Sequence, residues 1–334
     1  MGDRNISLAE AEKLAVRALT HHRVSPDNAD SVARALVSAE ADGLKGHGLS
    51  RLPSYCGQSA SGKVDGFAIP AAVRAANAAI RVDARNGFAY PALDLAIEQL
   101  AELTAVTGIA VAAVFNSHHC GVAGHHVEAM ARKGMCALLF ANTPKAIAPW
   151  GGSQGIYGTN PIAFAAPRPG AAPLVIDLSL SKVARGKIMF AQQEGKPIPE
   201  GWALDSAGNP TTDPGAALNG TMLPMGGAKG AALVMMVEIL AAALPAANFG
   251  FEASSFFTAD GPPPGVGQLL IALAPGILSG GGYESRIAAL TDAVLGQDNT
   301  RLPGDRRLEL RQQAESKGLQ LTRQQYEQLM SLCP

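Results

Sequence analysis

A histidine and an arginine lie close together where a predicted N-terminal helix ends, in the stretch DGLKGHGLSRLPSY (42–55). His47 stands between two glycines, and Arg51 follows it four residues later. A guanidinium group binds a carboxylate through two parallel hydrogen bonds, and an imidazole gives or takes a proton near neutral pH. The pair therefore predicts a site for a small acid, although histidine and arginine at a helix end also bind the free carbonyl groups there.

A second group of candidate residues is the cluster NSHHCGVAGHHVE (116–128), which holds four of the seven histidines. Three interpretations stay open. The imidazoles could bind a metal, but HExxH is absent and beyond Glu128 no cysteine or carboxylate stands at a recognised ligand spacing. They could instead cap a helix, or the segment from His119 to Ala123 could hold an anion such as a pyrophosphate at a helix N-terminus. In the last case Gly121 would let a ligand approach the backbone closely.

The common nucleotide and hydrolase motifs do not fit this chain. No GxGxxG follows a predicted strand and no GxxxxGK[ST] occurs, so neither an ordinary Rossmann site nor a P-loop is predicted. GGSQG (151–155) matches the nucleophile elbow of serine hydrolases, but Pro149 precedes it and no histidine follows it in the chain. A glycine turn is the simpler interpretation.

Composition narrows the class further. A chain of 334 residues with 47% hydrophobic residues can bury a large core in one or two domains. Its formal net charge of -1 argues against a nucleic-acid partner. Four cysteines without CxxC spacing indicate reduced thiols in a cytoplasm. We expect no signal peptide and no membrane span, because the N-terminus and the apolar runs are interrupted by charged or polar residues.

The elements that must position these residues alternate between helices and apolar strands. Helices are predicted over 8–19, 25–41, 91–103, 122–132 and 230–244, and again after Tyr283. Strands are predicted over 79–84, 108–116, 135–142, 160–167, 173–179 and 267–274. Unbroken apolar strands are usually covered on both faces, which predicts an α/β fold. The Gly- and Pro-rich segment 181–226 has little periodicity and is expected to be a long functional flap.

Longer motifs make the chain resemble a known family. These motifs are GHGLSRLPSY, NGFAYPAL, SHHCGVAG, GTNPIAFAAPR, IDLSLSKVARGKI, LPMGGAKGAALVMMVEIL, NFGFE and RLPGDRR. In this order they resemble the type-2 malate/L-lactate dehydrogenases, a non-Rossmann family of NAD(P)H-dependent oxidoreductases. The similarity covers nearly the whole chain. Within the family, PIAFAAPRPG, NFGFE and RLPGDRR look most like the reductases of two cyclic imino acids, delta-1-piperideine-2-carboxylate and delta-1-pyrroline-2-carboxylate.

The resemblance implies a mixed, largely buried seven-stranded sheet flanked by helices and assembled as a homodimer. We expect the N-terminal helical part, 1–75, to carry His47 and Arg51 and to pack with C-terminal helices in 283–334. Residues 76–282 would then form the α/β cofactor-binding domain, with the flap at 181–226.

The resemblance also implies roles for individual residues. His47 matches the family's proton donor, Arg51 the arginine that binds the substrate carboxylate, and Thr159 a substrate contact. His119 is a reserve acid or base, because related ureidoglycolate dehydrogenases use a histidine in this region. The implied cofactor contacts are His119, Cys120, Gly121, Val122, Ala123, Asp177, Leu178, Ser179, Lys229, Arg301, Leu302, Pro303, Gly304, Asp305, Arg306 and Arg307. The three arginines of RLPGDRR suit a 2′-phosphate, so we expect NADP(H) rather than NAD(H), and no metal.

Two departures from the imino-acid reductases leave the substrate open. Gly46 stands where those enzymes have a serine, and Lys187 where they have an aspartate that orients the proton donor. A lysine cannot replace that aspartate, because a nearby cation disfavours an imidazolium. The leading hypothesis is NADPH-dependent reduction of a cyclic imino acid to L-proline or L-pipecolate, with His47 as the proton donor. The alternatives are a dehydrogenase of malate, lactate, ureidoglycolate or a similar 2-hydroxy acid, a metal-dependent protein built on the histidine cluster, and a catalytically silent binding protein.

Overall fold

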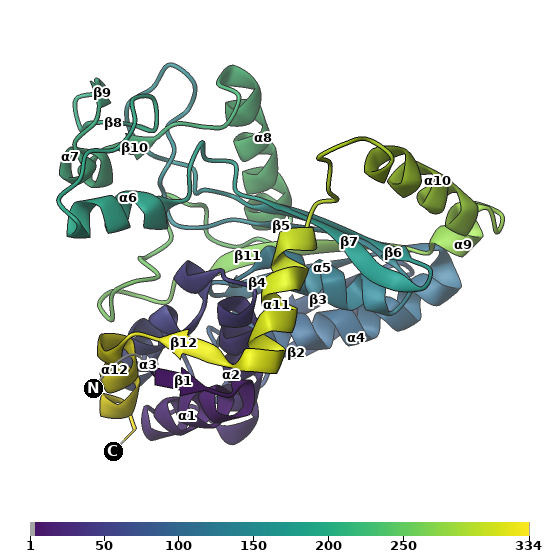
Figure 1. The fold of residues 1–334 in the computed structure, drawn as a ribbon, viewed down its shortest axis with the longest axis horizontal. Helices are drawn as coiled ribbons and strands as arrows, with labels where there is room; N and C mark the ends of the chain where they lie inside the picture. The colour runs from purple at the N-terminus through teal and green to yellow at the C-terminus, as the bar shows by residue number, and fades with distance from the viewer. Residues whose placement is uncertain (1–3, 334) are drawn as a thin grey trace.

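One mixed seven-stranded sheet forms the centre of the molecule (Figure 1), and the computed structural model describes residues 4–333. The strand order is β2–β3–β4–β11–β5–β6–β7, and within this sheet only β3 and β4 run parallel. A Rossmann sheet is mostly parallel, so the predicted non-Rossmann, seven-stranded fold is confirmed. The strands are β2 (Ala71–Ala76), β3 (Ala79–Asp83), β4 (Ile109–Ser117), β5 (Cys136–Ala141), β6 (Ile162–Arg168), β7 (Ala171–Leu178) and β11 (Val266–Leu273).

Both faces of the sheet are covered, as the apolar strands predict. On one face Leu139 and Leu270 pack with two helices, α4 and α5. On the other face their chain neighbours Phe140 and Leu269 pack with α8, with the π-helical turn η3 and with the flap. Successive side chains of a strand point to opposite faces, which explains the alternation. The covering elements are α4 (Ala89–Thr107), α5 (Ala123–Arg132), α8 (Ala228–Glu238) and η3 (Ile239–Ala243).

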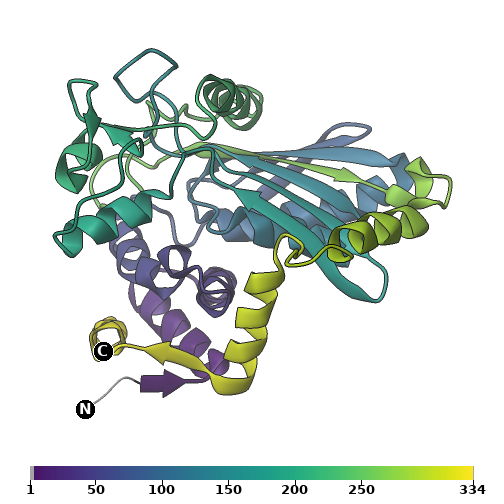
Figure 2. The same ribbon diagram turned by 45° about the horizontal axis from the view of Figure 1, so that its top comes forward.

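The two ends of the chain build a separate helical layer beside the sheet (Figure 2), in which β1 pairs with β12. The side chains of Ser7 and Ser25 cap its first two helices, accepting hydrogen bonds from the backbone N–H of Glu10 (3.1 Å) and Asn28 (3.4 Å). The elements are β1 (Arg4–Ile6), α1 (Leu8–His21), α2 (Pro26–Ala41), η1 (Lys45–His47), η2 (Leu49–Arg51), α3 (Leu52–Ser61), α11 (Asp305–Lys317), β12 (Leu319–Leu321) and α12 (Arg323–Ser331).

Two short helices lie at the opposite end of the sheet (Figure 1), namely α9 (Pro275–Leu278) and α10 (Tyr283–Leu295). The Tyr283 hydroxyl donates a hydrogen bond to Pro167 O (3.0 Å) at the end of β6. The C-terminal region is therefore divided: α10 packs on the sheet, and the chain from Asp305 onward joins the N-terminal helices.

The flap contains more regular structure than its composition predicts. It forms a small sheet of order β10–β8–β9, and Ile188 and Ala203 are buried among its apolar residues. Its elements are α6 (Arg185–Gln193), β8 (Ala203–Leu204), β9 (Pro210–Thr211), α7 (Pro214–Asn219) and β10 (Thr221–Met222). In the part of the chain that the structure describes, no helix has both the length and the apolar content needed to cross a membrane.

Candidate functional site

His47 and Arg51 lie on two consecutive 3-10 turns, η1 and η2, which connect α2 to α3. The Glu40 carboxylate ties these turns back to α2 by accepting a hydrogen bond from Leu49 N (3.0 Å). A side chain at position 48 would collide with this carboxylate, so the second glycine of GHG is required by packing. The guanidinium of Arg51 is buried and donates from Nε to the carbonyl oxygen of Gly46 (3.0 Å).

The ring of His119, which follows β4, stacks on the ring of His47 with centroids 5.2 Å apart. Nδ1 of His119 lies 2.6 Å from the hydroxyl of Tyr55, and that hydroxyl lies 3.1 Å from the hydroxyl of Tyr90. Burial raises the pKa of Tyr55 to about 12, so the phenol stays protonated and holds the imidazole by a hydrogen bond. The structure thus brings His119 next to the predicted His47, and it adds Tyr55, to which the sequence alone assigns no role.

Burial and neighbouring cations keep both stacked imidazoles neutral. Burial, then the charges of Arg51 and His125, lower the pKa of His47 to about 4. Burial, then Arg51 and His47, lower the pKa of His119 well below its ordinary value. Nδ1 of His47 and Nη1 of Arg51 are also buried without a hydrogen-bond partner among the described residues. Because such unpaired atoms are rare in folded proteins, we infer that they face a polar ligand.

Thr159, the predicted substrate contact, lies in the turn before β6, which is held by a buried carboxylate. Its backbone N–H donates to the hydroxyl of Thr143 (2.9 Å). Glu238 of α8 accepts hydrogen bonds from the Asn160 side chain (2.9 Å) and from Gly158 N (3.2 Å) on either side of it. The sequence analysis assigns no role to Glu238, although it is the single charged residue in the apolar run 230–244. A lone charge in an apolar helix is the signal that could have found it.

A cavity of about 610 Å³ lies between the start of α11 and the turn that leads from α2 to His47. Arg301 and Arg306 line it and are exposed. Its full lining is Asp42, Gly43, Leu44, Arg301, Leu302, Pro303, Gly304, Arg306, Arg307 and Leu310. Most of the predicted 301–307 segment therefore faces one space.

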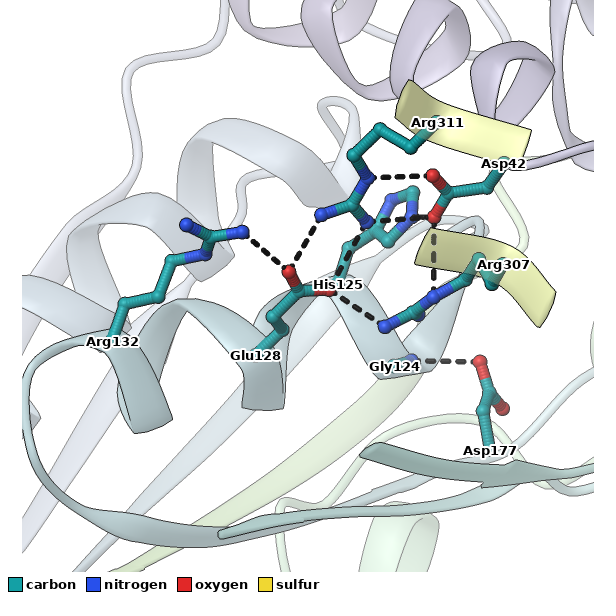
Figure 3. A network of polar contacts seen from close by, with 8 residues as sticks. All are labelled: Asp42, Gly124, His125, Glu128, Arg132, Asp177, Arg307 and Arg311. Carbon is teal, nitrogen blue, oxygen red and sulfur yellow. Dashed lines mark hydrogen bonds and ion pairs between the residues drawn. The ribbon is translucent and has the colours of Figure 1, made fainter. Parts of the chain in front are cut away.

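Arg307 belongs to a buried network of charges that joins three parts of the chain (Figure 3). Arg307 and Arg311 of α11 bind Glu128 of α5, each at 2.7 Å, and Arg311 also binds Asp42 at the end of α2 (2.7 Å). Nε2 of His125 lies 2.8 Å from Asp42 Oδ2. Burial opposes ionisation of Glu128, but the hydrogen bonds of Arg311 and Arg132 overcome it and lower its pKa to about 2.

The N-terminus of α5 is contacted by a carboxyl group of the protein itself, that of Asp177. The carboxylate of Asp177, at the end of β7, accepts a hydrogen bond from Gly124 N (2.7 Å; Figure 3). At Gly121 an added Cβ would lie 2.5 Å from the hydroxyl of Tyr90. Gly121 thus makes room for Tyr90, and close approach of a ligand at this position stays a prediction.

The remaining predicted cofactor residues are dispersed and do not line the cavity at Arg301. Leu178 is 47% exposed, and Lys229 is exposed in the first turn of α8. The hydroxyl of Ser179 lies 2.7 Å from that of Ser181. Cys120, Val122 and Ala123 are buried in the core.

The four clustered histidines point to different partners. His118 bonds the side chain of Gln58 (2.9 Å), and His126 bonds the carbonyl oxygen of Cys120 (2.8 Å). His119 and His125 have the partners described above. Among residues 4–333, no three side chains of metal-binding type are grouped in a way that could hold an ion. The cluster therefore divides among the imidazole stack (His119), the network of charges (His125) and the structural core (His118 and His126).

The non-Rossmann sheet and the histidine–arginine pair define a class of dehydrogenases. The profile of the malate/L-lactate dehydrogenase family matches residues 6–330, and the chain belongs to this family. Its relatives are named dehydrogenases and reductases, so the protein is an oxidoreductase.

Two relatives differ in the substrate that their names give. The chain is 55% identical over 310 residues to the (2R)-3-sulfolactate dehydrogenase (NADP(+)) of Chromohalobacter salexigens, which covers 93% of this chain and 92% of the relative. It is 39% identical over 330 residues to the Delta(1)-pyrroline-2-carboxylate/Delta(1)-piperideine-2-carboxylate reductase of Pseudomonas syringae pv. tomato, covering 98% of this chain and 96% of the relative. The solved structure of delta1-piperideine-2-carboxylate reductase from that organism matches with a TM-score of 0.94 at 39% identity, over 98% of this chain and 99% of the other.

Proposed function

We propose that the protein is an NADP(H)-dependent 2-hydroxy-acid dehydrogenase, with 3-sulfolactate as the first substrate to test. The observation that carries this proposal is the 55% identity to a protein named as a (2R)-3-sulfolactate dehydrogenase, against 39% for the imino-acid reductase. It reverses the order in which the sequence alone placed the two substrates. The sequence supports the new order, because Gly46 and Lys187 depart from the reductase pattern.

The chemistry follows from a neutral imidazole beside a guanidinium. Arg51 binds the carboxylate of the acid and so places its C2 hydroxyl for proton transfer. His47, uncharged at neutral pH because its pKa is about 4, accepts the hydroxyl proton. In the cavity lined by Arg301 and Arg306, bound NADP⁺ would supply the acceptor for the hydride of C2. The substrate carboxylate offsets the charge of Arg51, which stabilises the imidazolium that forms.

Cyclic imino-acid reduction is the second candidate. It is favoured by the relative that is 39% identical and by the match to that enzyme's solved structure. For this reaction His47 must arrive protonated, because it gives a proton to the imine nitrogen. Its depressed pKa counts against this.

A substrate panel decides between the two candidates. We expect kcat/KM with NADP⁺ and 3-sulfolactate, malate or lactate to exceed kcat/KM with NADPH and either cyclic imine by at least tenfold. Absorbance of NADPH measures both reactions, and Arg51→Ala serves as the control that removes the carboxylate-binding group. A higher kcat/KM with a cyclic imine would transfer the proposal to the second candidate.

The lining of the cavity supports a 2′-phosphate site for NADP(H). Arg301 and Arg306 are exposed there, and Arg307 is held by carboxylates. A guanidinium binds a phosphate through two hydrogen bonds, and bonds to charged groups contribute about 1.5–3 kcal/mol each. We therefore propose that Arg301 and Arg306 bind the 2′-phosphate and that Arg307, which is paired with carboxylates, does not.

We expect Arg306→Ala, and Arg301→Ala to a similar degree, to raise KM for NADPH about tenfold and to change KM for NADH less than twofold. The matched control is Arg286→Ala, which removes an exposed arginine of α10. Initial rates with both cofactors measure the effect. An equal rise in KM for both cofactors would show that these arginines do not select the phosphate.

We also propose that the enzyme is a homodimer, as its family resemblance implies. Large apolar side chains of α8, of η3 and of the residue after η3 are exposed: Leu233 is 37% exposed, Ile239 48% and Leu244 61%. Exposed apolar surface of this kind is normally covered by a partner. A second copy of the chain is the partner that we propose for these side chains.

A further inference from the structure

The segment 249–264, which lies between η3 and β11, carries two aromatic side chains into the candidate site. The guanidinium of Arg51 lies over the ring of Phe257, 4.2 Å from its centroid. The ring of Phe256 lies 5.1 Å from the ring of His119. A residue distant in sequence thus covers one face of the group that binds the substrate carboxylate.

A buried lysine fastens this segment to the helix that follows Arg51. Lys63 is 3% exposed, and its ammonium donates to the carbonyl oxygens of Ser255 (2.7 Å), Thr258 (3.0 Å) and Asp260 (2.8 Å). An ammonium has three N–H donors, so all of them are used. Gln58 of α3 adds a bond from its side chain to the carbonyl oxygen of residue 256 (2.9 Å). The backbone on both sides of Phe257 is therefore fixed relative to α3.

The contacts of Arg51 leave one edge of its guanidinium for a ligand. Nε is used by the carbonyl oxygen of Gly46, and one planar face is covered by Phe257. Nη1 has no partner among the described residues. An arginine side chain has many rotamers in solution, and holding it in one of them before the ligand arrives reduces the entropy lost on binding.

We propose that Phe257 is a positioning residue for the substrate carboxylate, and that Lys63 holds it in place. Phe257 fixes the plane of Arg51, so that the Nη edge meets the carboxylate in the two-bond geometry. This inference rests on the proposed function in requiring a substrate with a carboxylate. It does not depend on whether the reacting group is a hydroxyl or an imine, because the carboxylate is common to both candidates.

The test compares an acid substrate with its neutral amide in Phe257→Leu. We expect KM for the acid to rise about 5- to 30-fold, with kcat changed less than threefold and KM for NADP(H) unchanged. For the amide, which cannot form the charged two-bond contact, kcat/KM should change less than twofold. Phe257→Tyr keeps an aromatic face and should restore KM for the acid to within twofold of wild type. Because Phe257 is 43% exposed, the substitution leaves no buried cavity.

Lys63→Met is the second variant, and it should reproduce the selective loss for the acid through release of the segment. If KM for the acid and KM for the amide change equally in Phe257→Leu, so that their ratio stays at the wild-type value, the proposal is overturned. The proposed function is tested separately, with the wild-type enzyme. It fails if the wild type reduces cyclic imines in preference to oxidising 2-hydroxy acids. In that event the imine acid and its amide take the place of the hydroxy acid and its amide in the same comparison.

Discussion

Replacing His47 by glutamine is expected to lower kcat for oxidation of the 2-hydroxy acid about 10²- to 10⁴-fold, with KM for NADP⁺ unchanged. Glutamine fills similar space but cannot accept a proton, so the loss measures proton transfer. The matched control is His21→Gln, an exposed histidine of α1, which should leave kcat unchanged. Steady-state rates at saturating cofactor measure the effect.

The same residue sets the expected pH dependence. Because the pKa of His47 is lowered to about 4, the imidazole is a free base over most of the accessible pH range. Since kcat/KM reports the free enzyme, the value for oxidation should stay level from pH 8 to about pH 5 and fall as the pH approaches 4. An ordinary histidine would lose activity already near pH 6.5. A larger loss of kcat in His119→Gln than in His47→Gln would assign the base to His119 instead.

The closeness of His47 and Arg51 was predictable from local sequence, because the two residues lie only four positions apart. An imidazole four residues before an arginine, between glycines, indicated a site for a small acid, and the structure places Arg51 and His119 around that imidazole. The order of the longer motifs implied the sheet. Both inferences depend on residues that lie close together in the chain or that follow a known order.

The supporting contacts were not predictable, because each joins segments far apart in the sequence. Lys63 reaches a carbonyl group 197 positions further along the chain, and Arg311 reaches Asp42 across 269 positions. From sequence alone the three arginines of 301–307 are chemically equal. Only the nearby carboxylates of Asp42 and Glu128 distinguish Arg307 from the other two.

The edge strand β2 shows a different limit of sequence patterns. Its residues AAVRAA are mostly exposed and lack the alternation of a half-buried strand, so the strand was not predicted. The strand is held in the sheet by antiparallel pairing with β3, from Ala71 opposite Asp83 to Ala76 opposite Ala79.

The second large effect is expected on stability, in Arg311→Met. Breaking a buried ion pair by removing one partner costs about 3–5 kcal/mol. Asp42 and Glu128, with side chains 0% and 5% exposed, both lose a guanidinium in this variant. Arg307 remains as a partner for both, so we expect the free energy of unfolding to fall by about 3 kcal/mol, measured by urea denaturation at pH 7. Arg323→Met is the control: its pair with Glu327 is exposed, and we expect no measurable loss.

The pH dependence of this difference identifies the network as its cause. The pKa of Glu128 lies at about 2 in the folded protein, below its ordinary value of 4.5. A lowered carboxyl pKa stabilises the folded state above the unfolded pKa, and this stabilisation is lost as the pH falls through the folded pKa. Wild type should therefore lose stability between about pH 4.5 and 2, and the gap to Arg311→Met should narrow over the same range. If the difference in free energy of unfolding between wild type and Arg311→Met stays constant with pH, the loss comes from packing of the arginine stem and not from its charge.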